Sequence, residues 1–163
     1  MLLSKLENQN IPMKKTEYRL DEQIRQAFLS LETKWTEKEI GFQVELEEVK
    51  YTGNEGLFMH IWINLLDNAI RAAAETHGEK YIKSYIYMKE VGGFCVIKIT
   101  NPFENIKHTQ DGDFATTKKD DGMHGIGLHS VRRIAEKYGG CLMCTAADKT
   151  FETVLLISTD EEI

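Results

Sequence analysis

The chain contains the stretch INLLDNAIR at residues 63–71, in which polar side chains interrupt an otherwise apolar run. Asn64, Asp67, Asn68 and Arg71 are spaced i, i+3, i+4 and i+7, so on a helix they share one stripe. The neighbouring residues leave little polar surface, and such a helix is expected to be buried nearly all round. A buried amide or carboxylate without a hydrogen-bond partner costs roughly 2–7 kcal/mol. The stripe therefore indicates either a satisfied core network or a ligand site.

A second informative stretch is rich in glycine. The sequence GMHGIGL occupies residues 122–128, and apolar residues then recur at helical spacing from Val131 to Tyr138. Gly139 and Gly140 follow, as expected at the C-terminus of a helix. A glycine-rich loop that enters a helix presents backbone N–H groups and the positive end of the helix dipole to phosphate oxygens. The stretch is neither a Walker loop nor a dinucleotide fingerprint, because the residues that those motifs require are missing.

Together the two stretches resemble the motifs of a known family. Residues 64–69 resemble the asparagine box, and HGIGL at residues 124–128 resembles the second glycine box, of the GHKL ATP-binding domain of sensor histidine kinases. The resemblance covers roughly residues 17–158, and the glycine box is most similar to that of the peptide-pheromone receptor kinases. It implies the Bergerat fold, an α/β (α+β) two-layer sandwich. Helices pack on one face of a mixed, mostly antiparallel sheet, and ATP binds between the helices and a long loop.

The resemblance also implies roles for the polar stripe. The later asparagine of the family's box coordinates the Mg²⁺ that bridges the ATP phosphates, so Asn68 is the expected metal ligand, and an amide oxygen suits that ion. Asn64 stands where hydrolytic relatives keep a glutamate, and an amide cannot act as a general base. Asn64 and Asn68 are therefore the expected catalytic residues of a site that holds ATP for transfer. Arg71 is a candidate phosphate contact or an ion-pair partner of Asp67, which is expected to be structural.

Further nucleotide contacts are expected outside this helix. Asn101 stands where the family has an aspartate that accepts a hydrogen bond from the adenine amino group, and a neutral amide accepts more weakly. As an alternative, Asn101 is a turn residue before Pro102. Lys118 and Lys119 lie in the expected ATP lid and are candidate phosphate contacts, although a charged run is usually solvated. The other expected contacts are those of the glycine box: His124, Gly125, Ile126, Gly127 and Leu128.

Composition limits the class of protein. The 163 residues suit one domain, and 20 basic against 26 acidic residues give a net charge of −6, which does not favour nucleic-acid binding. No apolar run approaches the ~20 residues of a membrane span, so this domain is expected to make no direct membrane contact. The resemblance implies the cytoplasmic catalytic end of a membrane-bound bacterial receptor. Cys141 and Cys144 have C-x-x-C spacing, but no second pair completes a zinc site.

The chain is divided into a linker remnant, residues 1–16, and the catalytic domain, residues 17–163. Hydrophobic periodicity and turn residues predict the elements of this domain. In order they are a helix at 20–35, a strand at 40–46, the asparagine-box helix fading near 77–78, a hairpin of strands 81–89 and 94–100, the glycine-box helix, and a hairpin of strands 142–147 and 151–158.

Three functions agree with these features. The first is the catalytic domain of a two-component sensor histidine kinase, which positions Mg·ATP for phosphoryl transfer to a histidine on a separate dimerisation domain, with a response regulator downstream. No histidine precedes His60, so the isolated chain is expected not to autophosphorylate. The second is a GHKL serine kinase or ATPase. The third is a degenerate, non-catalytic module that binds partners, which the unusual Asn101-Pro102-Phe103 segment favours.

Overall fold

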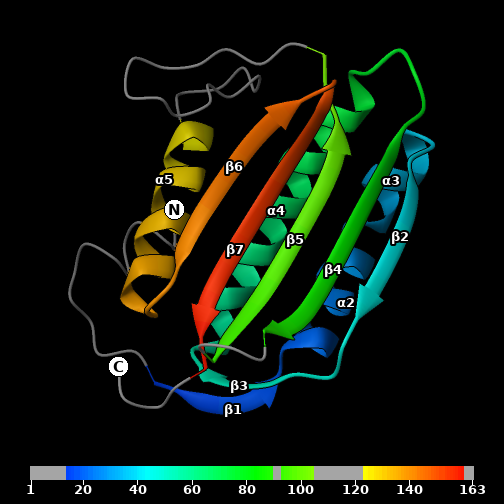
Figure 1. Ribbon diagram of the computed structural model, residues 1–163. Helices are drawn as coiled ribbons and strands as arrows, with labels where there is room; N and C mark the ends of the chain where they lie inside the picture. Colours follow the sequence, from blue (N-terminus) through cyan, green and yellow to red (C-terminus); the bar gives the residue numbers. More distant parts are fainter. Residues whose placement is uncertain (1–13, 90–92, 105–122, 160–163) are drawn as a thin grey trace.

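The computed structural model describes residues 14–89, 93–104 and 123–159, with side chains omitted at 88, 89 and 123–126. A five-stranded sheet forms one layer of the molecule (Figure 1). Strand β2 runs parallel to β4, and every other neighbouring pair is antiparallel, so the sheet is mixed and mostly antiparallel, as predicted. Its strands in spatial order are β2 (Gly41–Leu46), β4 (Tyr81–Lys89), β5 (Phe94–Pro102), β7 (Thr150–Ser158) and β6 (Cys141–Ala147).

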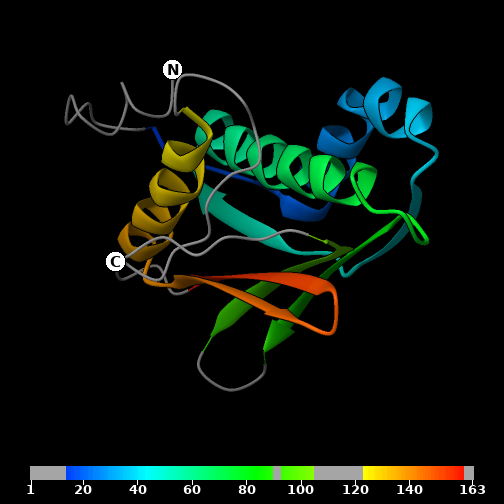
Figure 2. The same cartoon turned by 90° about the horizontal axis from the view of Figure 1, so that it is seen from above.

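The helices form the second layer and lie on one face of this sheet (Figure 2). They are α2 (Leu20–Ser30), α3 (Glu32–Glu37), α4 (Glu55–Ala74) and α5 (Met123–Lys137). The predicted helix at 20–35 is divided in two, because the backbone leaves helical geometry at Leu31, where ψ is 8°. The two-layer α/β sandwich predicted from the resemblance is confirmed.

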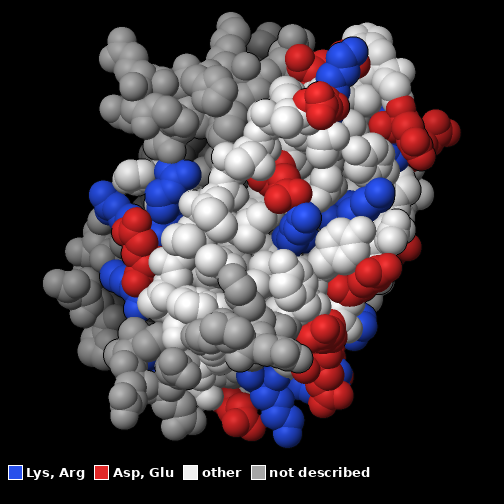
Figure 3. Space-filling model, viewed as in Figure 1, with Lys and Arg blue, Asp and Glu red and all other residues white. Residues whose placement is uncertain are grey.

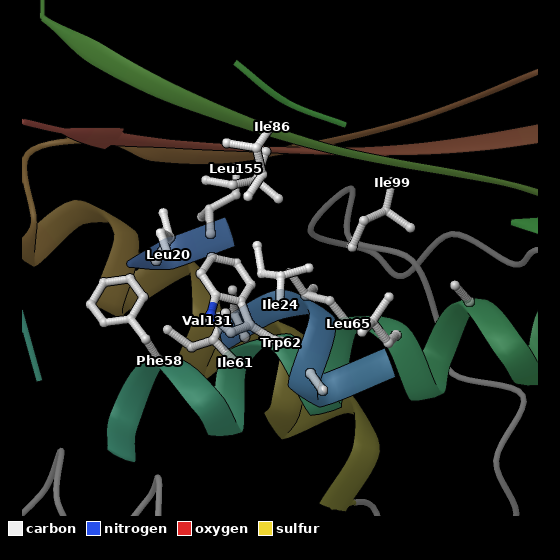
Figure 4. Close-up of a cluster of buried hydrophobic side chains, with 14 of the residues drawn as sticks. Leu20, Ile24, Phe58, Ile61, Trp62, Leu65, Ile86, Ile99, Val131 and Leu155 are labelled. Carbon is white, nitrogen blue, oxygen red and sulfur yellow. The ribbon is translucent and has the colours of Figure 1, made fainter. Parts of the chain in front are cut away.

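The core lies between α4 and the sheet, where large apolar side chains from both layers meet (Figure 4). Trp62 of α4 is 1% exposed, and its indole N–H donates to Gln23 Oε1 of α2 at 2.7 Å. Gln23 Nε2 in turn donates to the carbonyl oxygen of Glu55 at 2.8 Å. Buried polar groups cost little when they are paired in this way, so the two hydrogen bonds fix α2 on α4 without an unsatisfied amide.

A small second sheet was not predicted. It pairs β1 (Thr16–Arg19) with β3 (Lys50–Gly53) in antiparallel register. Each strand has four residues, which is too short for a clear alternation of apolar and polar side chains. The sheet is stabilised from the side by aromatic rings, since Tyr51 of β3 packs edge-on against Phe58 with ring centroids 5.3 Å apart.

Charged side chains of both signs are interspersed on the sheet face that Figure 3 shows, which is the face turned away from the helices in Figure 1. Lys98 of β5 and Glu152 of β7 form an ion pair of 3.1 Å there, and both side chains are 35% exposed. Within the described residues, none of the helices has the length and apolar character required to cross a bilayer.

Candidate functional site

The polar stripe of α4 is only partly buried. Asn64, Asp67 and Asn68 are half-buried, whereas Arg71 is exposed. The expectation of a helix buried nearly all round is therefore wrong along this stripe. Residues on the opposite side of α4, such as Trp62 and Leu66, are 1% exposed and supply the packing that holds the helix on the sheet. The stripe remains accessible enough to meet a ligand.

Asn64 joins the two motifs in space. Its Nδ2 donates to the carbonyl oxygen of His60 one turn earlier, at 2.9 Å. This bond turns Oδ1 toward α5, where a Cβ added to Gly127 would lie 3.5 Å from Asn64 Oδ1. That distance is an ordinary van der Waals contact, so a methyl group would fit but a larger side chain would fill the space in front of Asn64. The asparagine and glycine motifs, far apart in the sequence, therefore face one another.

Asp67 and Arg71 are engaged with charged partners. The Asp67 carboxylate is 14% exposed and lies 3.1 Å from Lys34 Nζ of α3 and 3.5 Å from Arg71 Nε. The expected Asp67–Arg71 ion pair is thus present, and Lys34 adds a second cation that the sequence did not indicate. These contacts give Asp67 a structural role, because it connects α3 to α4.

Asn101 is the penultimate residue of β5 and lies on the face that the helices cover. It is 2% exposed, and its Nδ2 donates to the carbonyl oxygen of Pro102 at 2.9 Å. This hydrogen bond engages the side-chain nitrogen of Asn101 with the backbone. The side-chain oxygen, Oδ1, therefore points away from the Pro102 carbonyl group. In the register Asn101 pairs with Phe151 and Ile99 pairs with Thr153, so Thr153 is a diagonal neighbour of Asn101 on the same face.

Thr153 is a polar residue that the sequence reasoning missed. It is 7% exposed, beside the similarly buried Leu155 and Ile157 on the same face of β7. The sequence pattern could have predicted this position, because a threonine at an inward-facing position of a strand with alternating apolar residues places a hydroxyl group in the core. Thr153 and Asn101 together place two side chains capable of hydrogen bonding on the helix-covered face of β7 and β5.

The glycine motif is helical in the structure. Helix α5 begins at Met123, so Gly125 and Gly127 lie inside the helix, whereas a loop leading into the helix was expected. Glycine costs roughly 1 kcal/mol in a helix interior relative to alanine, and the packing of Val131 and Ile134 in the core outweighs it. Gly127 is buried and Leu128 packs against the core. Lys118 and Lys119 lie outside the described residues, as do the side chains of His124 and Ile126.

The three cysteines differ in burial, since Cys95 is buried whereas Cys141 and Cys144 are half-buried. Burial raises the pKa of the Cys95 thiol to about 12, and the charge of Glu47 adds to that rise, so the thiol stays protonated at neutral pH. Cys141 and Cys144 are not joined in a disulfide; they lie three residues apart on β6, and alternation along a strand places them on opposite faces. The described residues contain no group of three or more His, Cys, Asp or Glu side chains suited to a metal ion.

Residues 57–158 match the family described as the GHKL domain, a span that contains all but the first two residues of α4, the sheet strands β4 to β7 and α5. The chain belongs to the GHKL domain family. No curated protein sequence matches this GHKL domain.

Solved structures with the same fold include those of histidine kinases. AdeS of Acinetobacter baumannii matches with a TM-score of 0.73 and 17% identity, over 98% of this chain and 74% of AdeS. The catalytic domain of ThkA matches with a TM-score of 0.70 and 25% identity, over 90% of this chain and 97% of that domain. ShkA in complex with AMPPNP matches with a TM-score of 0.72 and 15% identity, over 97% of this chain and 34% of ShkA. ThkA has also been solved with the response regulator TrrA.

Proposed function

We propose that this GHKL domain binds Mg·ATP as the catalytic domain of a two-component sensor histidine kinase. It positions the γ-phosphate for transfer to a histidine on a separate dimerisation domain. The observation that carries the proposal is the approach of Asn64, in the half-buried asparagine stripe of α4, to Gly127 of α5. Both lie on the sheet face that carries Asn101 near the end of β5. Amide oxygens suit a metal ion, and the N–H groups at a helix N-terminus suit phosphates. A buried hydrogen-bond acceptor suits the amino group of a purine.

Different residues of this chain bind different parts of the nucleotide. Asn68 supplies an amide oxygen, a hard ligand of the kind that Mg²⁺ prefers, and the bound ion would neutralise phosphate charge. Asn64 orients the site without activating water, because an amide has no basic lone pair for a proton. Asn101 accepts a hydrogen bond from adenine. The phosphates are contacted by three basic side chains and by the glycine box, namely Arg71, Lys118, Lys119, His124, Gly125, Ile126, Gly127 and Leu128.

The remaining parts of the proposal concern partners and context. ShkA was solved with AMPPNP and ThkA with a response regulator, which supports nucleotide binding and downstream transfer for a domain of the same fold. Residues 17–163 are the proposed catalytic domain, and β1 extends this unit by one residue, to Thr16. The HGIGL wording favours the peptide-pheromone receptor subgroup, and such a domain would lie on the cytoplasmic side of a membrane receptor.

Calorimetric titration with AMPPNP tests the proposal. The parent chain is expected to bind only weakly without Mg²⁺ and more tightly with it, and Asn68→Ala is expected to remove the magnesium-dependent part. Gln43→Ala is the matched control, because it removes an exposed amide on β2, away from the site. Failure of the folded parent to bind millimolar AMPPNP would contradict the proposal and favour the partner-binding module, to which the Asn101-Pro102-Phe103 segment points.

A further inference from the structure

The carboxylate of Glu104 ties together two segments that are distant in the sequence. Its Oε1 accepts a hydrogen bond from the backbone N–H of His77 at 2.6 Å, and its Oε2 lies 2.7 Å from His77 Nδ1. Both carboxylate oxygens of Glu104 thus contact the same residue, His77. We call this pair the His77–Glu104 clamp.

The clamp joins the ends of the two elements that carry the candidate site. His77 follows closely on the C-terminal end of α4, the helix of Asn64 and Asn68. Glu104 comes three residues after Asn101, beyond the end of β5. The clamp is therefore a direct hydrogen-bonded connection between the segments that follow the proposed metal ligand and the proposed adenine acceptor.

The segment that carries Glu104 is also held from the other side. The backbone N–H of Phe103 donates to the carbonyl oxygen of Lys149 at 3.1 Å, in the turn between β6 and β7. The Phe103 ring lies edge-on to Phe151, with centroids 6.3 Å apart. These contacts fix Phe103 on the sheet, and they therefore also fix the backbone position of the adjacent Glu104, whose side chain binds His77.

We propose that the His77–Glu104 clamp is a positioning device that holds the end of α4 against the end of β5 and thereby sets the affinity of the nucleotide site. This inference rests on the proposed function. The His77 side chain is 92% exposed and that of Glu104 is 30% exposed, and exposed pairs of this kind contribute little to the free energy of unfolding. Hydrogen bonds at such a position matter more for local geometry than for global stability.

The expected effect on affinity follows from population arithmetic. A nucleotide that bridges α4 and β5 binds only molecules in which the two ends are correctly spaced. The apparent dissociation constant is the intrinsic one divided by the fraction of competent molecules. If loss of the clamp reduces that fraction to about 10–20%, the affinity falls about five- to tenfold.

Calorimetric titration of the whole chain with Mg·AMPPNP tests the clamp. Glu104→Ala and His77→Ala are each expected to weaken AMPPNP binding about five- to tenfold, with little change in melting temperature. Glu104→Gln keeps an oxygen that can accept the His77 N–H and is expected to recover most of the affinity. Glu152→Ala is the matched control, because it breaks the partly exposed Lys98–Glu152 ion pair on the opposite face of the sheet.

The outcomes separate the two proposals. Binding by the parent, with Glu104→Ala and His77→Ala within twofold of it, would overturn the clamp and leave the proposed function standing. Equal weakening by Glu104→Ala and Glu152→Ala would also overturn it, because the effect would then be general. No binding by the folded parent would overturn the proposed function and the clamp together.

Discussion

At the scale of single residues, Asn101 shows that two interpretations which the sequence left open agree with one geometry. A turn residue before proline and an adenine acceptor were both reasonable interpretations. The side chain donates a hydrogen bond to the carbonyl oxygen of Pro102, the last residue of β5, and it is also 2% exposed on the face covered by helices. The two interpretations are compatible, because the bond uses the amide nitrogen and leaves the oxygen as the acceptor.

Replacing Asn101 with leucine removes this acceptor and keeps a side chain of four heavy atoms branched at Cγ. A neutral hydrogen bond contributes about 0.5–1.5 kcal/mol, so the affinity for AMPPNP is expected to fall about two- to tenfold in calorimetric titration. Thr100→Val is the control, since the adjacent residue of β5 points to the other face. Unchanged affinity in Asn101→Leu would leave only the structural role of the asparagine.

Glu104 is expected to titrate below the ordinary glutamate value of 4.5. Its pKa is lowered by the backbone N–H of His77 first and by the His77 ring second, while burial opposes them. A group whose pKa is lower in the folded state contributes stability that is present above its unfolded pKa and is lost as the pH falls through its folded pKa. The backbone amide shift of His77, followed by NMR, should therefore change with a midpoint below 4.5. A midpoint at or above 4.5 would show that the clamp is absent in solution.

At the scale of elements, the turn from α5 into β6 depends on two glycines. Gly139 has a φ of 72°, in the left-handed region, and the N–H of Gly140 donates to the Ala135 carbonyl oxygen at 2.8 Å. The predicted glycine C-cap of α5 is thus confirmed. The turn lies directly on β7, because a Cβ added to Gly140 would be 1.7 Å from the carbonyl oxygen of Leu156.

Gly140→Ala is expected to destabilise the fold. The clashing atoms belong to the backbone of a central strand and cannot rotate aside, so α5 would have to move, at a cost on the order of 3 kcal/mol or more. Gly78→Ala is the control, because no heavy atom lies within 4 Å of the added Cβ. Urea denaturation measures both variants. Equal stability of the two would mean that the turn can shift away from β7 freely.

Asp21 connects three elements at the start of α2. Its buried carboxylate accepts hydrogen bonds from Arg19 at 2.6 Å and from the backbone N–H of Val49 at 3.2 Å. Burial alone would raise the pKa of Asp21, but these hydrogen bonds outweigh it, and the pKa lies below the ordinary value of 3.8. The carboxylate therefore stabilises the junction of β1, α2 and β3 above that value, and this contribution is lost as the pH falls through the lowered pKa.

Asp21→Ala is expected to lower the free energy of unfolding by about 2 kcal/mol at neutral pH, after allowance for the partial exposure of Arg19. The difference from the parent should shrink in acid, below the lowered pKa. Urea denaturation at several pH values measures it. Glu22→Ala is the control, because Glu22 pairs with the same arginine but is 58% exposed. A constant difference at all pH values would exclude the carboxylate as the cause.

At the scale of the whole molecule, one sheet supports every part of the candidate site. Helices α4 and α5 share the same face (Figure 2), and β5 brings Asn101 to its end. Such a site can hold ATP, but transfer requires an acceptor, and this chain has no histidine before His60. We therefore expect no acid-labile phosphate on the chain incubated alone with labelled Mg·ATP. Addition of a histidine-bearing dimerisation domain should supply the acceptor, and label on the isolated chain would contradict this prediction.

The sequence by itself determined the family motifs and the order of the larger elements, and the resemblance that those motifs carry implied the two-layer fold. The order of the elements could be predicted because long helices and paired strands have a hydrophobic period that local residues set, as in α4 and in the hairpin of β6 and β7. Short elements gave no such signal, and β1 with β3 therefore escaped prediction. Only the tertiary structure decided the contact of Asn64 with Gly127, the pairing of Asp67 with Lys34, the place of Thr153 beside Asn101, and the His77–Glu104 clamp. Each of these joins residues from different elements, and such contacts depend on how the layers pack rather than on any local pattern.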